Sequence, residues 1–145
     1  MNEQDPVQIA LAAHAARHAG RWALLRTEHI ERHAANRPPP GAVVFYGTST
    51  IKRWHSLPRD FAGRQVVGVG MIAAVCDALT AWYDELVLPL QPRRLVLFAG
   101  IVEAALGVPP DAVAAGLEAM CLHARARQPG LPVALLSLLA SPRMP

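Results

Sequence analysis

Four short apolar runs, separated by stretches with helical spacing, constrain the fold of this chain more than any other feature. Each run places apolar residues at consecutive positions, which is typical of strands buried on both faces of a parallel sheet. Helices that connect such strands cover the two faces, so the alternation predicts an α/β fold with a mainly parallel sheet of about four strands. The expected strands are residues 42–46, 65–69, 94–99 and 131–140, and helices are expected at 49–54, 73–88 and 109–127.

A long helix is expected before the first strand. Residues 6–35 are rich in alanine, and Glu28 and Arg32 stand four positions apart, as in an exposed helical ion pair. The prolines at 38–40 cannot donate helical hydrogen bonds, so the helix ends before them. We therefore divide the chain into an N-terminal helical extension (1–37) and an α/β domain (38–145).

Composition excludes several function classes. The 145 residues suffice for one domain with a core, and the net charge of +3 is carried by scattered arginines rather than by a basic cluster. We expect no nucleic-acid partner. No segment approaches the roughly 20 apolar residues of a membrane span, and the first residues lack the features of a secretory signal. We expect no membrane partner, a cytoplasmic location, and reduced thiols at Cys76 and Cys121.

Ser49 is the first candidate functional residue. The run from Val43 to Ile51 breaks at Gly47 and places a serine just after the strand, where ligands of open α/β sheets bind. At the start of a helix, Ser49 would lie beside backbone N–H groups that have no intrahelical partner. It could be a nucleophile with part of an oxyanion site beside it, or only a capping residue.

Residues 22–143 resemble the bacterial SGNH (GDSL-like) esterases. The matching motifs, in chain order, are Gly47-Thr48-Ser49, Ile51-x-x-Trp54, Asp60-Phe61-x-Gly63, Val87-Leu88-Pro89, Pro92-Arg93-Arg94-x-Val96, Phe98-Ala99-Gly100, and a closing strand followed by Ser-Pro-Arg at 141–143. The resemblance implies a flavodoxin-like three-layer α/β/α sandwich and ester hydrolysis with Ser49 as the nucleophile. It also implies an oxyanion hole made by the serine N–H, a glycine N–H and an asparagine side chain, with a late Asp-x-x-His as the base.

The chain departs from this family pattern at three places. Ala73 stands at the donor glycine; it keeps an N–H but resists a positive φ. The Gly-x-Asn-Asp motif is present as Gly100-Ile101-Val102-Glu103, and Val102 has no hydrogen-bond donor. Losing one such donor costs about two to three orders of magnitude in rate. No Asp-x-x-His occurs before Pro145.

No other histidine is expected to replace the missing base. His55 is six residues after Ser49, roughly 9 Å along a helix axis, and His123 is expected near the opposite face. The resemblance therefore implies a degenerate, C-terminally truncated member without the last strand and helix of the fold.

Two functions are consistent with these residues. The first is an impaired serine hydrolase for a small ester substrate, with Ser49 as vestigial nucleophile and the Ala73 N–H as residual oxyanion donor. The second is a non-catalytic binding or oligomerisation module, which either holds a small ligand at the mouth of the sheet or joins copies of the chain into a homo-oligomer through the exposed edge of the fourth strand.

Two further patterns carry less weight. Residues 68–73 match the dinucleotide fingerprint G-x-G-x-x-A, but they follow the second expected strand, and no acidic residue closes the next one. The pairs His14/His18 and His29/His33 have helical i,i+4 spacing, and we expect them to face solvent. We expect neither a cofactor nor a metal.

Overall fold

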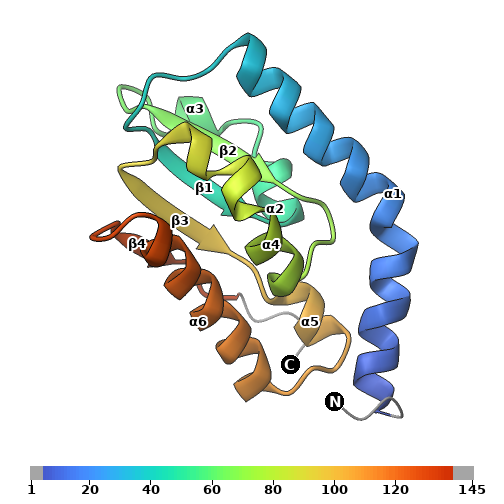
Figure 1. The fold of residues 1–145 in the computed structure, drawn as a ribbon. Helices are drawn as coiled ribbons and strands as arrows, with labels where there is room; N and C mark the ends of the chain where they lie inside the picture. The colour runs from blue at the N-terminus through green and yellow to red at the C-terminus, as the bar shows by residue number, and fades with distance from the viewer. Residues whose placement is uncertain (1–4, 139–145) are drawn as a thin grey trace.

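The computed structural model describes residues 5–138, which form a parallel sheet between two layers of helices (Figure 1). The strands are β1 (Val43–Gly47), β2 (Val66–Gly70), β3 (Arg94–Phe98) and β4 (Val133–Leu135). Their order across the sheet is β2-β1-β3-β4, and every neighbouring pair is parallel. The predicted α/β architecture, with its four-stranded sheet and long first helix, is confirmed.

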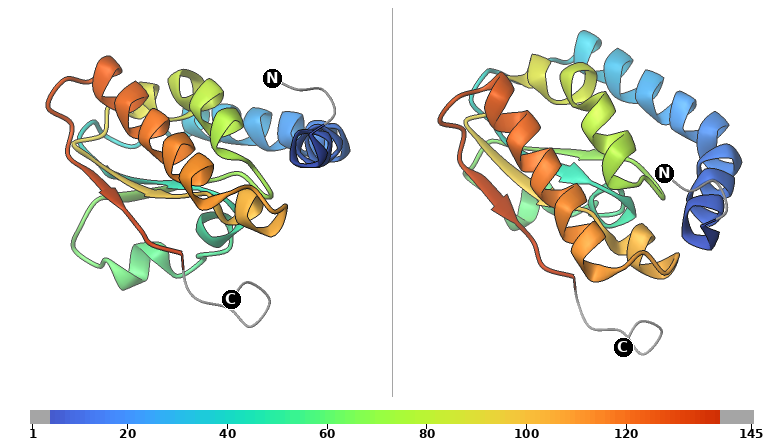
Figure 2. Two further views of the ribbon diagram at one scale, coloured as in Figure 1. Left: turned by 90° about the horizontal axis from the view of Figure 1, so that it is seen from below. Right: turned by 60° about the horizontal axis from the view of Figure 1, so that its bottom comes forward.

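The helices lie on both faces of the sheet (Figure 2). Helices α4 and α6 cover one face with α1 beside α4, and α2 and α3 lie on the other. Their bounds are α1 (Pro6–Ala35), α2 (Ser49–Lys52), α3 (Leu57–Asp60), α4 (Cys76–Leu86), α5 (Ile101–Ala105) and α6 (Pro110–Arg127), with a 3-10 helix η1 (Leu88–Leu90).

Successive residues of β1 point into two separate apolar cores. Val44 and Tyr46 are fully buried beneath α1, α4 and α6, whereas Phe45 packs against Ile51 and Leu57 from α2 and α3. This alternation follows from the two-residue period of a strand, and it explains why the run is apolar at every position. The hydroxyl of Tyr46 donates to the Leu79 carbonyl at 2.7 Å, so the buried phenol keeps a partner.

Helix α1 packs against the α/β layers through residues 14–29. It begins at Asp5, whose side chain accepts a hydrogen bond from the Val7 N–H at 2.9 Å. Trp22 and Leu25 are buried in the core, and the Trp22 ring lies 5.3 Å from that of Trp82 on α4. Arg26 adds a salt bridge to Glu85 at 2.5 Å.

Several predicted boundaries differ from the structure. The helix expected at 73–88 begins only at Cys76, because Ala73 has a positive φ of 59° that a helix cannot accommodate. The helix expected at 49–54 ends at Lys52, and the sequence did not predict α3 or α5. Strand β4 is shorter than the expected 131–140; residues 139 and 140, like the Ser-Pro-Arg at 141–143, lie outside the described residues.

No helix within residues 5–138 combines the length and the apolar character needed to span a bilayer.

Candidate active site

Ser49 lies at the carboxyl end of β1 and is the first residue of α2. The corner that carries Ser49, residues 47–52, packs closely against the backbones at the ends of β2 and β3. A Cβ on Gly47 would lie 2.0 Å from the Phe98 carbonyl oxygen of β3, and one on Gly70 would lie 2.1 Å from the Lys52 nitrogen of α2. Only glycine fits at either position, because real Cβ atoms do not approach so closely. The two glycines thus bring the ends of β2 and β3 against the turn that carries Ser49.

The residue at the helix N-cap is Thr48, not Ser49. Thr48 is buried, and its side chain makes no capping hydrogen bond. The Ser49 hydroxyl instead accepts a hydrogen bond from the Ala73 N–H at 3.3 Å. The side chain is therefore directed toward the loop after β2 rather than toward its own first turn.

Ala73 lies in the left-handed region with φ of 59°. This conformation costs a residue with a Cβ on the order of 1 kcal/mol, and the sequence had suggested that alanine would resist it. Ala73 and Ser49, the two residues that the family resemblance relates, are in contact.

Three side chains of α1 hold the loop that contains Ala73. His14 lies 2.7 Å from the Ala73 carbonyl oxygen through Nε2, and the Trp22 indole N–H donates to the Ile72 carbonyl at 2.9 Å. His29 contacts the Gly70 carbonyl oxygen at 3.0 Å through Nε2. A carbonyl oxygen can only accept, so the two imidazoles are donors at Nε2.

The expectation that these histidines face solvent is wrong. His29 is 1 % exposed and His14 is half-buried. Burial lowers the pKa of His29, and the nearby cations Lys52 and Arg32 lower it further, whereas the bond to Gly70 and the Glu28 carboxylate oppose this shift. One signal of this burial is local, since positions 14, 18, 22, 25 and 29 recur every three or four residues along one helical face.

Val102 and Glu103 lie on α5, just after β3. Val102 is half-buried and offers no donor to the corner occupied by Ser49. Glu103 is only 7 % exposed, and its Oε1 accepts a short hydrogen bond from the Cys76 N–H at the start of α4. A carboxylate at a helix N-terminus is stabilised by the exposed N–H groups and the helix dipole. The sequence indicated Glu103 only as the fourth residue of the Gly100-Ile101-Val102-Glu103 motif.

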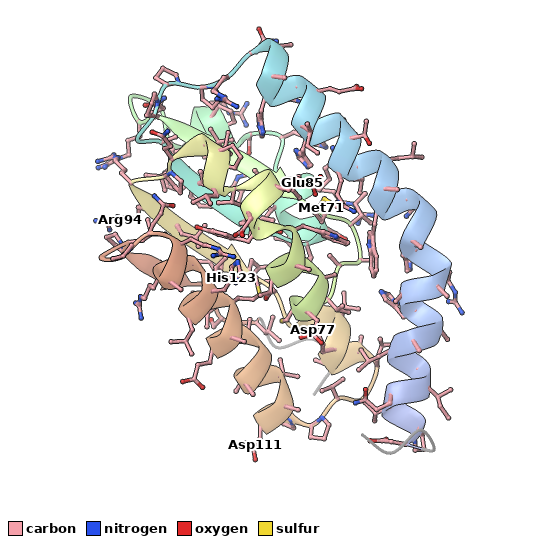
Figure 3. The ribbon with its side chains drawn as sticks, in the orientation of Figure 1. Met71, Asp77, Glu85, Arg94, Asp111 and His123 are labelled. Carbon is pink, nitrogen blue, oxygen red and sulfur yellow. The ribbon has the colours of Figure 1, made fainter. Side chains whose placement is uncertain are left out.

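Within residues 5–138, no imidazole hydrogen-bonds the Ser49 hydroxyl. His123 lies in the later half of α6 (Figure 3), and its Nε2 bonds Asp84 of α4 at 2.9 Å. The same part of the chain holds no group of three metal-ligating side chains.

Comparisons with known proteins agree on the architecture. No family model and no curated protein sequence matches the chain. Among solved structures, it is similar to a protein from Streptococcus pneumonia provisionally described as a platelet activating factor, with a TM-score of 0.74, 17% identity and 91% of this chain covered. A GDSL-like lipase from Bacteroides thetaiotaomicron has a TM-score of 0.66, 22% identity and 82% coverage of this chain. The chain has the fold of the SGNH/GDSL-like hydrolases.

A third similar structure, provisionally described as an acylhydrolase from Bacteroides fragilis, has a TM-score of 0.58 and 24% identity over 72% of this chain. The aligned regions cover 61%, 62% and 55% of these three proteins, so the chain spans less than two thirds of each. At these identities the similarity shows the SGNH/GDSL-like fold and says nothing of the chemistry of Ser49.

Proposed function

We propose that this chain is an SGNH-type serine ester hydrolase-like protein whose catalysis is impaired. The observation that carries the proposal is the hydrogen bond from the Ala73 N–H to the Ser49 hydroxyl at 3.3 Å. In ester hydrolysis the Ser49 oxygen attacks the ester carbonyl carbon, and the carbonyl oxygen becomes negatively charged. That oxygen is then two bonds away from the Ser49 oxygen, within reach of the Ala73 N–H and of the helix-start N–H of Ser49 itself.

Two missing groups, an oxyanion donor and a general base, limit the rate of ester hydrolysis. Val102 has no donor for the oxyanion, a loss worth about two to three orders of magnitude. Within the described residues no imidazole takes the proton from Ser49, and removing the base of a serine triad costs on the order of a millionfold in kcat. The proton must pass to water or hydroxide. We therefore propose slow hydrolysis of small, activated esters.

The test is hydrolysis of p-nitrophenyl acetate by the chain and by Ser49→Ala. We expect a small rate above buffer that Ser49→Ala removes. Ser56→Ala is a matched control, because Ser56 is a serine away from Ser49 whose hydroxyl, within residues 5–138, bonds only Asp60. Equal rates for the chain and Ser49→Ala contradict the proposal, and so does an equal loss in Ser56→Ala.

A second candidate function is assembly of copies of the chain through β4. The observation that favours it is the exposure of apolar side chains at this outer strand of the described sheet, where Leu135 is 47 % and Leu136 is 38 % exposed. Proteins usually cover or charge such an edge.

A further inference from the structure

An open groove of about 510 Å³ lies between residues 8–22 of α1 and the helices α4, α5 and α6. Its walls are mainly apolar or small. The lining residues that set its character are Leu11, Trp22, Val75, Val108, Val113 and Gly116. The volume falls within the range of small-molecule sites, which are typically apolar with a few placed polar groups.

The polar groups of this groove are mainly acidic. Glu103 and Asp77 line it, and the described lining includes no Lys, Arg or His. Asp77 lies in the first turn of α4, at the end of that helix nearest α5 (Figure 3). The positive end of the α4 dipole offsets only part of this charge, since a helix terminus is equivalent to about half an elementary charge.

Glu103 supplies the observation that points to a ligand. Its Oε1 is bonded to the Cys76 N–H, but its Oε2 is buried and has no hydrogen-bond partner among the described residues. An unpaired buried carboxylate oxygen is costly, and it gains most from a cationic donor. Neighbouring atoms cover Oε2 in this structure, so a ligand reaches it only after a small side-chain movement.

We propose that this groove binds a small primary ammonium ligand with an apolar body. The ammonium pairs with Glu103, with Asp77 adding to the negative potential at the groove. The apolar body packs along the walls beside Trp22 and Val113. This site uses neither the hydroxyl of Ser49 nor ester chemistry, so its test is independent of the test of the hydrolase proposal.

The probe is n-hexylammonium chloride, titrated into the full chain by isothermal calorimetry. The uncharged comparison is 1-hexanol, which has the same six-carbon chain. We expect n-hexylammonium to bind with a dissociation constant of about 1 mM or lower, and 1-hexanol to bind at least about tenfold more weakly. Equal binding of the two compounds, or no binding of n-hexylammonium, overturns the proposal.

Two variants locate the site. Glu103→Gln keeps the shape and one acceptor for the Cys76 N–H but removes the charge, and we expect affinity for n-hexylammonium to fall about tenfold to a hundredfold. Glu118→Gln on the exposed face of α6 is the matched control and leaves binding unchanged. Unchanged binding in Glu103→Gln overturns the proposal.

Ala112→Trp tests the same site if Glu103→Gln fails to fold. Ala112 lines the groove from an exposed position of α6, so Ala112→Trp fills the groove without altering the core. We expect it to abolish binding of n-hexylammonium while circular dichroism shows a folded chain. Retained binding in folded Ala112→Trp places the ligand elsewhere and overturns the proposal.

Discussion

Ala73 is the residue at which local preference and tertiary structure disagree. Its φ of 59° is one that glycine adopts freely and alanine does not, yet here the N–H of Ala73 reaches Ser49 and its carbonyl is held by His14. The hydrogen bonds of its N–H and its carbonyl maintain a positive φ that alanine does not favour by itself. Strain of this kind persists only where the surrounding structure fixes it.

This strain gives a prediction at the scale of one residue. Ala73→Gly removes the unfavourable Cβ, so we expect the free energy of unfolding to rise by up to about 1 kcal/mol. The greater entropy of glycine in the unfolded chain offsets part of this gain. Ala119→Gly, at an exposed interior position of α6, is the matched control and should lower it by about 1 kcal/mol. Urea denaturation measures both. Equal losses in the two variants would show that Ala73 carries no strain.

Among the elements, α1 has a structural role that its sequence did not predict. Its side chains bond the carbonyls of Gly70, at the end of β2, and of Ile72 and Ala73, in the loop that leads from β2 to α4. A helix placed before the first strand therefore positions the N–H nearest Ser49. Because the donors include buried His29, the docking of α1 depends on the protonation state of an imidazole.

This dependence gives a prediction at the scale of the element. The pKa of His29 is lowered in the folded chain, chiefly by burial, so below about pH 6.5 the unfolded chain binds more protons than the folded one. The free energy of unfolding should therefore fall as the pH decreases through this range. His29→Gln retains an N–H donor for the Gly70 carbonyl but does not titrate.

Urea midpoints at pH 7.5 and pH 5.5 test this. The chain should lose more stability than His29→Gln does, whereas the exposed-site control His55→Gln should lose as much as the parent chain. Equal losses in the parent chain and His29→Gln would contradict the assignment.

At the scale of the whole molecule, the sheet has two cores of different size and an outer strand with exposed leucines. Helices α4 and α6, with α1, cover the larger core, and α2 and α3 cover the smaller one. Strand β4 pairs with β3 through three residues and leaves Leu135 47 % exposed.

The edge gives a prediction about assembly. If copies of the chain pair through β4, light scattering coupled to size exclusion should give a dimer mass that Leu135→Lys shifts to the monomer. Leu122→Lys, at a 58 % exposed leucine of α6, should leave the dimer unchanged. A monomer mass for the parent chain excludes this pairing.

The pattern of residues along the chain was enough to predict the strands β1 to β3 and the long first helix, because buried parallel strands and helix-ending prolines leave local signals. It also predicted that Ser49 follows a strand end, whereas the role of Ala73 beside it was implied only by the resemblance to the SGNH esterases. The left-handed conformation of Ala73 and the bond from Cys76 to Glu103 left no such local signal, and the burial of His29 left only its place on one recurring face of the first helix. The hydrogen bonds at these residues join positions 59, 41 and 27 apart in the chain. Contacts of that range form only when α1, the β2–α4 loop and α5 are packed together, so they depend on the folded arrangement rather than on local preference.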